Sequence, residues 1–284
     1  MKLGLVLEGG GARCAYTAGA LEWLMDQKIH FEYGVGNSIC GLYLFCFLTE
    51  NRELLKEVST KIAMGKGTVG LPALLREGTL VGYNRMFEKV VASKHPLDME
   101  KVHALKGLAE VGVYDLKKGD SVWMNQKTLD DHLYYLKGAS TIPIFGKEVE
   151  IDGHFYLDGG LTAMIPIERA LKQKCDRYLI ITTKTKDYVR KPSSKLELGM
   201  IKHFYGDYPK LYEHVLNRSD YYYHERGIVD ELVREKKAMH LFPTDNCGVT
   251  RFGGTQQQFE ELYQRGYQDM EDKKEEILSF LKGE

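Results

Sequence analysis

Ser38 is the residue whose surroundings most suggest nucleophilic chemistry. It stands in Gly36-Asn-Ser38-Ile-Cys40-Gly41, after a short run of strand character and before the apolar segment 39–49, which we expect to form a buried helix. A serine in a tight turn from strand to helix presents its hydroxyl openly, and the helix N-terminus favours developing negative charge. Gly36 supplies one small neighbour, whereas Cys40 stands where this turn usually has a second glycine. Taken alone, the segment fits a helix-capping serine equally well.

A second candidate is the glycine-rich segment Glu8-Gly9-Gly10-Gly11-Ala-Arg13, between a predicted strand at 3–7 and a predicted helix at 15–28. Consecutive glycines allow backbone N–H groups to converge in front of a helix N-terminus, where they can bind an anion. A plain tight turn is the simpler interpretation of the same residues. Dinucleotide binding is disfavoured because Cys14 occupies the position of the third glycine in that motif.

The third candidate is Asp158, which is followed by Gly159 and Gly160. It ends a predicted hairpin whose turn is Asp152-Gly153, so its carboxylate would be held at a fixed point while the backbone turns away. Such an aspartate can act as a base, although an Asx turn that closes the strand explains the pattern too. His154 lies near the same hairpin turn, and we therefore expect an exposed residue and not a third catalytic group.

The elements around these candidates predict a single α/β domain. Residues 177–183 have the continuous β-branched character of a strand buried on both faces of a parallel sheet. Two further strands are predicted at 109–114 and 121–124, a last strand at 241–243 and a closing amphipathic helix at 256–281. Glycines interrupt the helical pieces of 51–106, where we expect a cap, and 199–239 is helical in pattern.

In their order along the chain, the three motifs resemble the patatin-like phospholipase family. The resemblance also includes 16–24, 139–145 and 158–166, and covers much of residues 2–183. It implies a three-layer α/β/α sandwich with a mostly parallel central sheet. The whole of 1–284 would then be one patatin-like domain, with the helical cap at about 51–106 and a helical C-terminal extension at about 199–284.

The resemblance also implies a serine acyl-ester hydrolase. Ser38 would attack a lipid or other acyl ester, Asp158 would take its proton, and an acyl-enzyme would be hydrolysed without metal or cofactor. Gly9, Gly10 and Gly11 would form the oxyanion hole with Arg13 beside them. Support for the elbow and for the aspartate loop would come from Gly36, Cys40, Gly159 and Gly160.

Two cysteines leave a second interpretation open. Cys14 and Cys40 replace glycines of the family pattern, which favours a catalytically weak protein that binds lipid or a protein partner through the same fold. Both precede or begin helices near the proposed oxyanion site, so the two thiols would lie close together and respond to oxidation, or else serve as independent packing residues.

Composition limits the classes of partner and the cellular compartment that we expect for this protein. A formal net charge of -1 gives no global field for nucleic acid. The apolar run 42–48 is far too short to span a bilayer, no signal peptide is evident, and five cysteines suggest no disulfide framework, so we expect a cytoplasmic protein. Seven aromatic residues fit an acyl-binding wall, a transient contact with a membrane surface, or simply packing in the core and at its rim, which is the commoner role: Phe204, Tyr205, Tyr208, Tyr212, Tyr221, Tyr222 and Tyr223.

Overall fold

A twisted sheet forms the centre of the protein in a computed structural model that describes residues 1–63, 65 and 67–283. Within these residues eight strands join one sheet in the order β5-β6-β3-β2-β1-β7-β8, and β4 pairs with β3. The strands are β1 (Leu3–Leu7), β2 (Tyr33–Asn37), β3 (Leu108–Asp115), β4 (Asp120–Asn125), β5 (Val149–Ile151), β6 (His154–Asp158), β7 (Arg177–Ile181) and β8 (Ala238–Leu241).

The five strands β3, β2, β1, β7 and β8 run parallel, and β4, β5 and β6 add antiparallel pairings at one side. Parallel neighbours need long crossover connections, and helices supply them. Alternate residues of β1 enter opposite cores: Leu5 and Leu7 pack on one face of the sheet and Val6 on the other. The sheet is therefore buried on both faces, as the apolar strand sequences predict.

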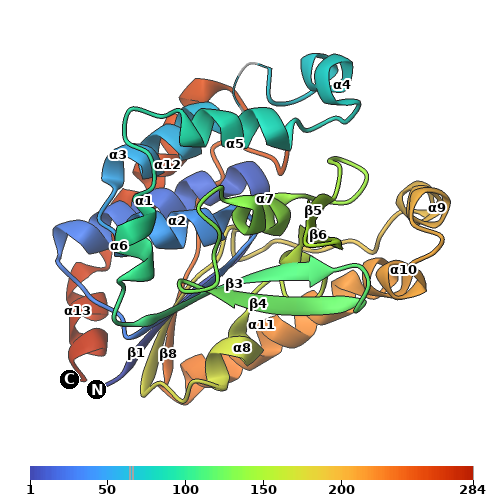
Figure 1. Ribbon diagram of the computed structural model, residues 1–284. Helices are drawn as coiled ribbons and strands as arrows, with labels where there is room; N and C mark the ends of the chain where they lie inside the picture. The colour runs from blue at the N-terminus through green and yellow to red at the C-terminus, as the bar shows by residue number, and fades with distance from the viewer. Residues whose placement is uncertain (64, 66, 284) are drawn as a thin grey trace.

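Helices cover both faces, so the predicted three-layer α/β/α sandwich with a mostly parallel sheet is confirmed (Figure 1). One layer contains α1 (Ala15–Asp26), α2 (Ile39–Leu48) and α12 (Gln256–Asp272), and the opposite layer contains α8 (Ile167–Leu171) and α11 (Arg218–Arg234). The other helices are α3 (Arg52–Glu57), α4 (Leu71–Glu77), α5 (Tyr83–Val91), α6 (Met99–His103), α7 (Tyr134–Ser140), α9 (Lys195–Phe204), α10 (Pro209–Leu216) and α13 (Lys274–Lys282).

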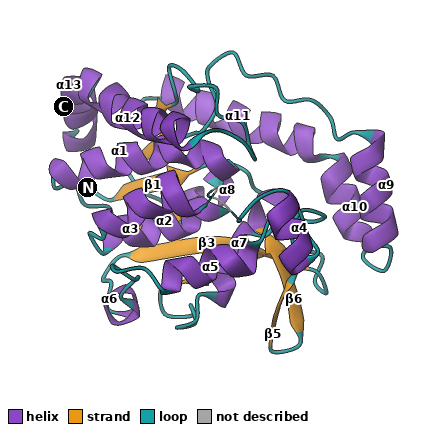
Figure 2. Ribbon diagram, turned by 90° about the horizontal axis from the view of Figure 1, so that it is seen from above, coloured by secondary structure: helices purple, strands orange, loops and turns teal. Residues whose placement is uncertain are grey.

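The segment 51–106 consists of the four short helices α3 to α6 and a π-helical turn at Val58–Ile62. Residues 199–284 contribute more than helices, because β8 extends the parallel sheet beside β7. The predicted hairpin forms as β5 and β6, with Asp152 and Gly153 both at positive φ in its turn, and it projects from the body of the molecule (Figure 2).

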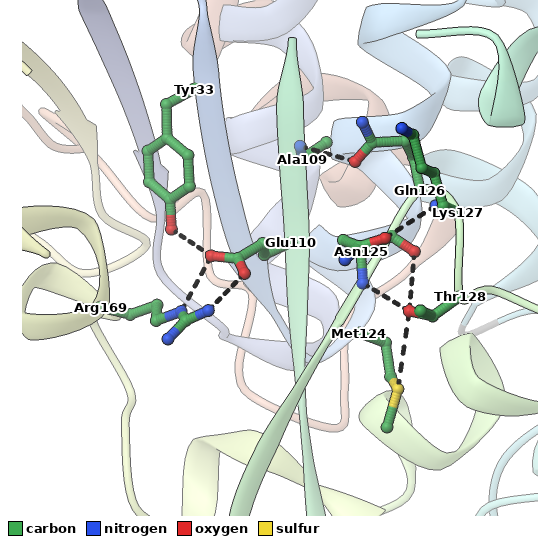
Figure 3. A network of polar contacts seen from close by, with 9 residues as sticks. All are labelled: Tyr33, Ala109, Glu110, Met124, Asn125, Gln126, Lys127, Thr128 and Arg169. Carbon is green, nitrogen blue, oxygen red and sulfur yellow. Dashed lines mark hydrogen bonds and ion pairs between the residues drawn. The ribbon is translucent and has the colours of Figure 1, made fainter. Parts of the chain in front are cut away.

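A buried carboxylate ties the middle of the sheet to α8. Glu110 on β3 accepts a hydrogen bond from the Tyr33 hydroxyl at 2.9 Å and pairs with the Arg169 guanidinium through both oxygens at 2.9 and 2.5 Å (Figure 3). At the edge of β3 that pairs with β4, Gln126 accepts from the N–H of Ala109 at 3.1 Å. These contacts fix β3, whose edge positions the candidate site described below.

Two glycines bring α1 and α12 into backbone contact. A Cβ on Gly19 would lie 1.8 Å from the carbonyl oxygen of Tyr263, and one on Gly266 would lie 2.0 Å from that of Tyr16. Only residues without a side chain permit this approach. Helix α12 is consequently part of the main helical layer.

Candidate active site

Two strands reach one edge of β3 from opposite directions and end beside each other. β2 runs parallel to β3 and ends with Asn37 opposite Gly112, whereas β6 runs antiparallel and ends with Asp158 opposite Val113. Ser38, the next residue after β2, therefore meets Asp158 although 120 positions separate them in the chain. Gly159 makes the junction possible, because a Cβ there would lie 2.4 Å from the carbonyl oxygen of Gly112.

Ser38 stands in a strained turn that begins α2. Its φ of 58° and ψ of -146° belong to a region that non-glycine residues rarely adopt, and such strain is typical of functional turns. The preceding residue holds the turn: Asn37 accepts from the Gly112 N–H at 3.0 Å and donates to the carbonyl oxygen of Ala163. The Ser38 side chain is thereby fixed at the N-terminus of α2.

Asp158 is a buried carboxylate that faces Ser38. Its Oδ1 accepts the N–H of Gly160 at 2.7 Å, and the Ser38 side chain lies near enough to favour its charged form. Burial raises the pKa of Asp158 above its ordinary value, while Gly160, Arg218, Ser38 and Arg251 partly offset this effect by favouring the charged form. Asp158 is thus a carboxylate with increased affinity for a proton, as a general base requires.

This raised pKa sets the expected pH dependence of any reaction that uses Asp158 as a base. Only the ionised carboxylate accepts a proton, so kcat/KM should rise as pH increases through the Asp158 pKa. Arg251→Gln removes a positive charge that lowers this pKa, and the acidic limb of the profile should move to higher pH. Profiles of kcat/KM against pH for the parent, Arg251→Gln and Arg234→Gln test this. An acidic limb in Arg251→Gln that is unmoved, or that moves to lower pH, would contradict it.

The glycine-rich loop places two free backbone donors at the same cavity. Gly9 is not one of them, because its N–H donates to the carbonyl oxygen of Met164 at 3.1 Å. The N–H groups of Gly10 and Gly11 have no acceptor in the part of the chain that the structure describes, as expected where a helical turn begins. Gly11 has φ +62°, and a Cβ on Gly10 would lie 2.4 Å from Thr183 Oγ1. The loop therefore needs glycine at both positions.

Glu8 fastens this loop to the end of β7, a role that the sequence did not reveal. Its Oε2 accepts the N–H and the hydroxyl of Thr183 at 2.6 and 3.0 Å, and its Oε1 pairs with the Lys184 ammonium. Glu8 and Lys184 are both buried. This internal ion pair holds the end of β1, and with it Gly9, beside the end of β7.

A cavity of about 360 Å³ brings most of the predicted residues together: Gly9, Gly10, Gly11, Arg13, Ser38, Asp158 and Gly160 line it. Sequence reasoning missed the rest of the wall, formed by Ile142, Met164, Lys184, Tyr188, Val189, Arg190, Lys191, Arg218 and Arg251. His154 lies elsewhere and pairs through Nδ1 with Asp115 at 2.9 Å. No group of three metal-ligating side chains is found among the described residues.

The unusual cysteine after Ser38 points away from the cavity. Cys40 is fully buried, and burial raises the pKa of its thiol well above the ordinary value, helped by the Cys14 thiol beside it. The close approach of the elbow to β3 uses Gly41 instead, where a Cβ would lie 2.4 Å from Val111. Gly36 packs against the Cys40 carbonyl oxygen, 2.7 Å from the position of a Cβ. The elbow thus forms with cysteine at position 40.

Comparison with known families identifies the class of protein. The model of the patatin-like phospholipase family matches residues 5–171, more than half of the chain, and a model described as a domain of unknown function (DUF6363) matches residues 208–282. The chain belongs to the patatin-like phospholipase family, a family of lipid hydrolase type.

Two individual proteins are similar to the chain. The uncharacterized protein YjjU of Escherichia coli (strain K12) is 26% identical over 196 residues, which are 64% of this chain and 52% of that protein. The chain thus spans about half the length of this curated relative. The crystal structure of VipD from Legionella pneumophila overlays with a TM-score of 0.51 and 12% identity, covering 95% of this chain and 66% of VipD. This second likeness concerns the fold alone.

Proposed function

We propose that the protein is a serine hydrolase of lipid acyl esters in which Ser38 is the nucleophile and Asp158 its base. The observation that carries the proposal is the meeting of Ser38, in its strained elbow, with the buried Asp158 carboxylate in one cavity. A nucleophile hydrogen-bonded to a fixed base is the arrangement from which an acyl-enzyme forms. Membership of the patatin-like phospholipase family supports a lipid as the substrate.

The reaction proceeds in two halves. Asp158 takes the hydroxyl proton as Ser38 Oγ attacks the ester carbonyl, and the tetrahedral intermediate collapses to an acyl-Ser38 ester while the leaving alcohol receives the proton. Asp158 then deprotonates a water that attacks the acyl group, and the carboxylic acid departs from a regenerated Ser38. In each half Asp158 takes up one proton and then releases it, to the leaving alcohol in the first half and to Ser38 Oγ in the second. The protons therefore balance without a metal or a cofactor.

The tetrahedral oxyanion is stabilised by the free N–H groups of Gly10 and Gly11 and by the N-terminal end of α2. These donors belong to a fixed backbone and need no rearrangement during the reaction, which is the source of their effect. Arg13 adds positive charge at the cavity wall and lies against Tyr188, 5.6 Å from the ring centre. Glu8 keeps the donor loop in place through Thr183 and Lys184.

Hydrolysis of acyl esters by the purified chain tests this function against its alternative, a patatin fold that binds lipid or protein without turnover. Esters of several acyl lengths should be hydrolysed, and a fluorophosphonate should label Ser38 covalently. Equal hydrolysis rates in the parent and in Ser38→Ala would exclude the enzyme and leave the binding protein.

A reducing compartment such as the cytoplasm is the proposed location, supported by five free cysteines, three of them buried.

We also propose a transient contact with a membrane surface through α4. Leu71, Leu74 and Leu75 on this helix are 65%, 42% and 80% exposed. Of the predicted aromatic surface, Tyr222 is buried in the core, whereas Phe204 and Tyr223 are exposed. A short helix with exposed leucines can insert its side chains into the interface of a bilayer. None of the helices that the structure describes is long and apolar enough to cross a membrane.

Replacing the three leucines together by serine should lower co-sedimentation with phospholipid vesicles, because each leucine contributes roughly 1.5–3 kcal/mol when it leaves water completely. Val233→Ser, an exposed apolar residue of α11, is the matched control and should sediment as the parent does. Sedimentation of the triple variant at the parental level would place the membrane contact elsewhere.

A further inference from the structure

The cavity beside Ser38 carries far more positive than negative charge. Six cationic residues line it, namely Arg13, Lys184, Arg190, Lys191, Arg218 and Arg251, and Asp158 is its single acidic lining residue among those described. The charge of Lys184 is neutralised by its ion pair with the buried Glu8 carboxylate. The arginines have no such partner, since Arg190, Arg218 and Arg251 form no ion pair with any residue that the structure describes.

Arg218 is the residue that points most clearly to an anion-binding position. It is only 6% exposed, and its Nε is buried without an acceptor in the described part of the chain. Burying a guanidinium without a partner is costly, so natural proteins keep such an arrangement where a bound group completes it. Arg218 is also the first residue of α11, and the positive end of the helix dipole adds to its charge.

Arg190 and Arg251 complete the same wall. The Nε of Arg190 is likewise buried without an acceptor, and its guanidinium lies 5.5 Å from the ring centre of Tyr222. Arg251 stacks at 5.2 Å from the ring centre of Phe252, and its carbonyl oxygen accepts the N–H of Ala12 at 3.0 Å. The loop that carries Arg251 therefore packs directly on the glycine-rich loop. The positive charges of Arg190 and Arg251 add to burial in lowering the pKa of Arg218, so three guanidinium groups repel one another across one space.

An anion with several oxygens would relieve this repulsion. Guanidinium groups bind phosphate through paired N–H donors, and a tetrahedral phosphate offers oxygens to more than one arginine at a time. A carboxylate has two oxygens and satisfies fewer donors. The cavity also contains the nucleophile, so a phosphate held here would be attached to the ester that Ser38 attacks.

We propose that residues 208–282, the segment that matches a domain of unknown function, supply an anion subsite that binds the phosphate of a lipid head group through Arg218 and Arg251, with Arg190 beside them. This inference rests on the proposed function for the identity of the substrate, and it assigns the C-terminal segment a role in selecting it. Phosphate-bearing acyl esters bind at the subsite, and neutral acylglycerols lack the group that fills it.

Calorimetric titration tests the subsite without requiring catalysis. Inorganic phosphate should bind the full-length parent, and Arg218→Gln and Arg251→Gln should each weaken that binding at least about 10-fold, the scale of a lost charged hydrogen bond. Arg234→Gln removes the same charge from the exposed end of α11 and should bind phosphate as the parent does. Thermal unfolding of each variant shows whether it is folded. If Arg218→Gln fails to fold, Arg251→Gln, at a half-buried residue, still tests the subsite. No phosphate binding by the parent, or equal binding by all variants, would overturn the subsite.

A second titration identifies the source of the phosphate. Ser38→Ala, which cannot turn over substrate, is titrated with 1-oleoyl lysophosphatidic acid and with 1-oleoylglycerol, two lipids that differ only in the phosphate. It should prefer the phosphate-bearing lipid at least about 10-fold, and adding Arg251→Gln should remove most of that preference. Equal affinity for both lipids would overturn the head-group assignment even where free phosphate binds. Preferential binding together with no hydrolysis by the parent would support the subsite while refuting the hydrolase.

Discussion

Ser38→Ala and Asp158→Asn should each lower kcat/KM for acyl esters by about 10⁴-fold, the scale of losing a member of a nucleophile and base pair. The alanine removes the attacking oxygen. The asparagine keeps nearly the same shape and can still meet Gly160 and Ser38, but it does not take up the serine proton. Because the two residues act as one unit, the kcat/KM of the double variant should lie within a small factor of that of the slower single variant.

The control for this prediction is His154→Ala. His154 is close to Asp158 in sequence, yet its imidazole, on the hairpin, pairs with Asp115 at the end of β3. Its variant should retain hydrolysis within about 2-fold of the parent, as expected of a surface site. Melting temperatures should show that all variants are folded. Hydrolysis that depends on His154 as strongly as on Ser38 would replace the dyad by a triad, and parental rates in Ser38→Ala would remove Ser38 from the chemistry.

The sheet and the three motifs were predictable because each depends on a short stretch of sequence. Apolar runs such as 177–181 predict strands buried on both faces, and Asp152-Gly153 predicts the hairpin turn. Ser38 and Asp158 each follow a strand closely enough for local pattern to locate them. Their meeting needs the register of β2 and β6 on β3, which no local pattern contains, and only the family resemblance pointed to it.

The arginines of the cavity wall were not predictable, because they come from distant parts of the sequence. Arg190 lies in the segment after β7, Arg218 begins α11 and Arg251 lies between β8 and α12, so no spacing rule connects them. The engagement of the Gly9 N–H by Met164 was equally hidden, because the acceptor follows Asp158 in the chain. Cys40 illustrates the limit of a motif: a missing glycine suggested a distorted elbow, whereas the close approach to β3 takes place at Gly41.

The position of Arg251 depends on how the C-terminal segment is seated. β8 pairs with β7, the Arg251 carbonyl oxygen in the following loop accepts the N–H of Ala12, and α12 then packs on α1 through Gly19 and Gly266. A Cβ on Gly11 would lie 2.4 Å from that same carbonyl oxygen. The C-terminal segment thus supports the glycine-rich loop as well as the cavity wall, and loosening α12 should disturb both.

Gly266→Ala should therefore destabilise the protein, although alanine is the better helix former. The added Cβ would lie 2.0 Å from the Tyr16 carbonyl oxygen, and two packed helices must separate to admit it. Overpacking costs about 1–3 kcal/mol or more, and an approach of 2.0 Å to a backbone atom places Gly266→Ala at the upper end, above the gain of about 1 kcal/mol in helix propensity. We expect a net loss of about 2 kcal/mol in the free energy of unfolding, measured by urea denaturation.

Gly227→Ala is the matched control, since Gly227 is an exposed glycine within α11 whose added Cβ would meet no atom within 4 Å. The same substitution there should raise the free energy of unfolding by about 0.4–1 kcal/mol, because alanine loses less conformational entropy on folding. The two variants change the same atoms in helices of equal length, 17 residues each, so opposite signs isolate the contact of α12 with α1. Stabilisation by both substitutions would mean that α12 does not rest on α1, and that Arg251 is not held against the glycine-rich loop by this contact.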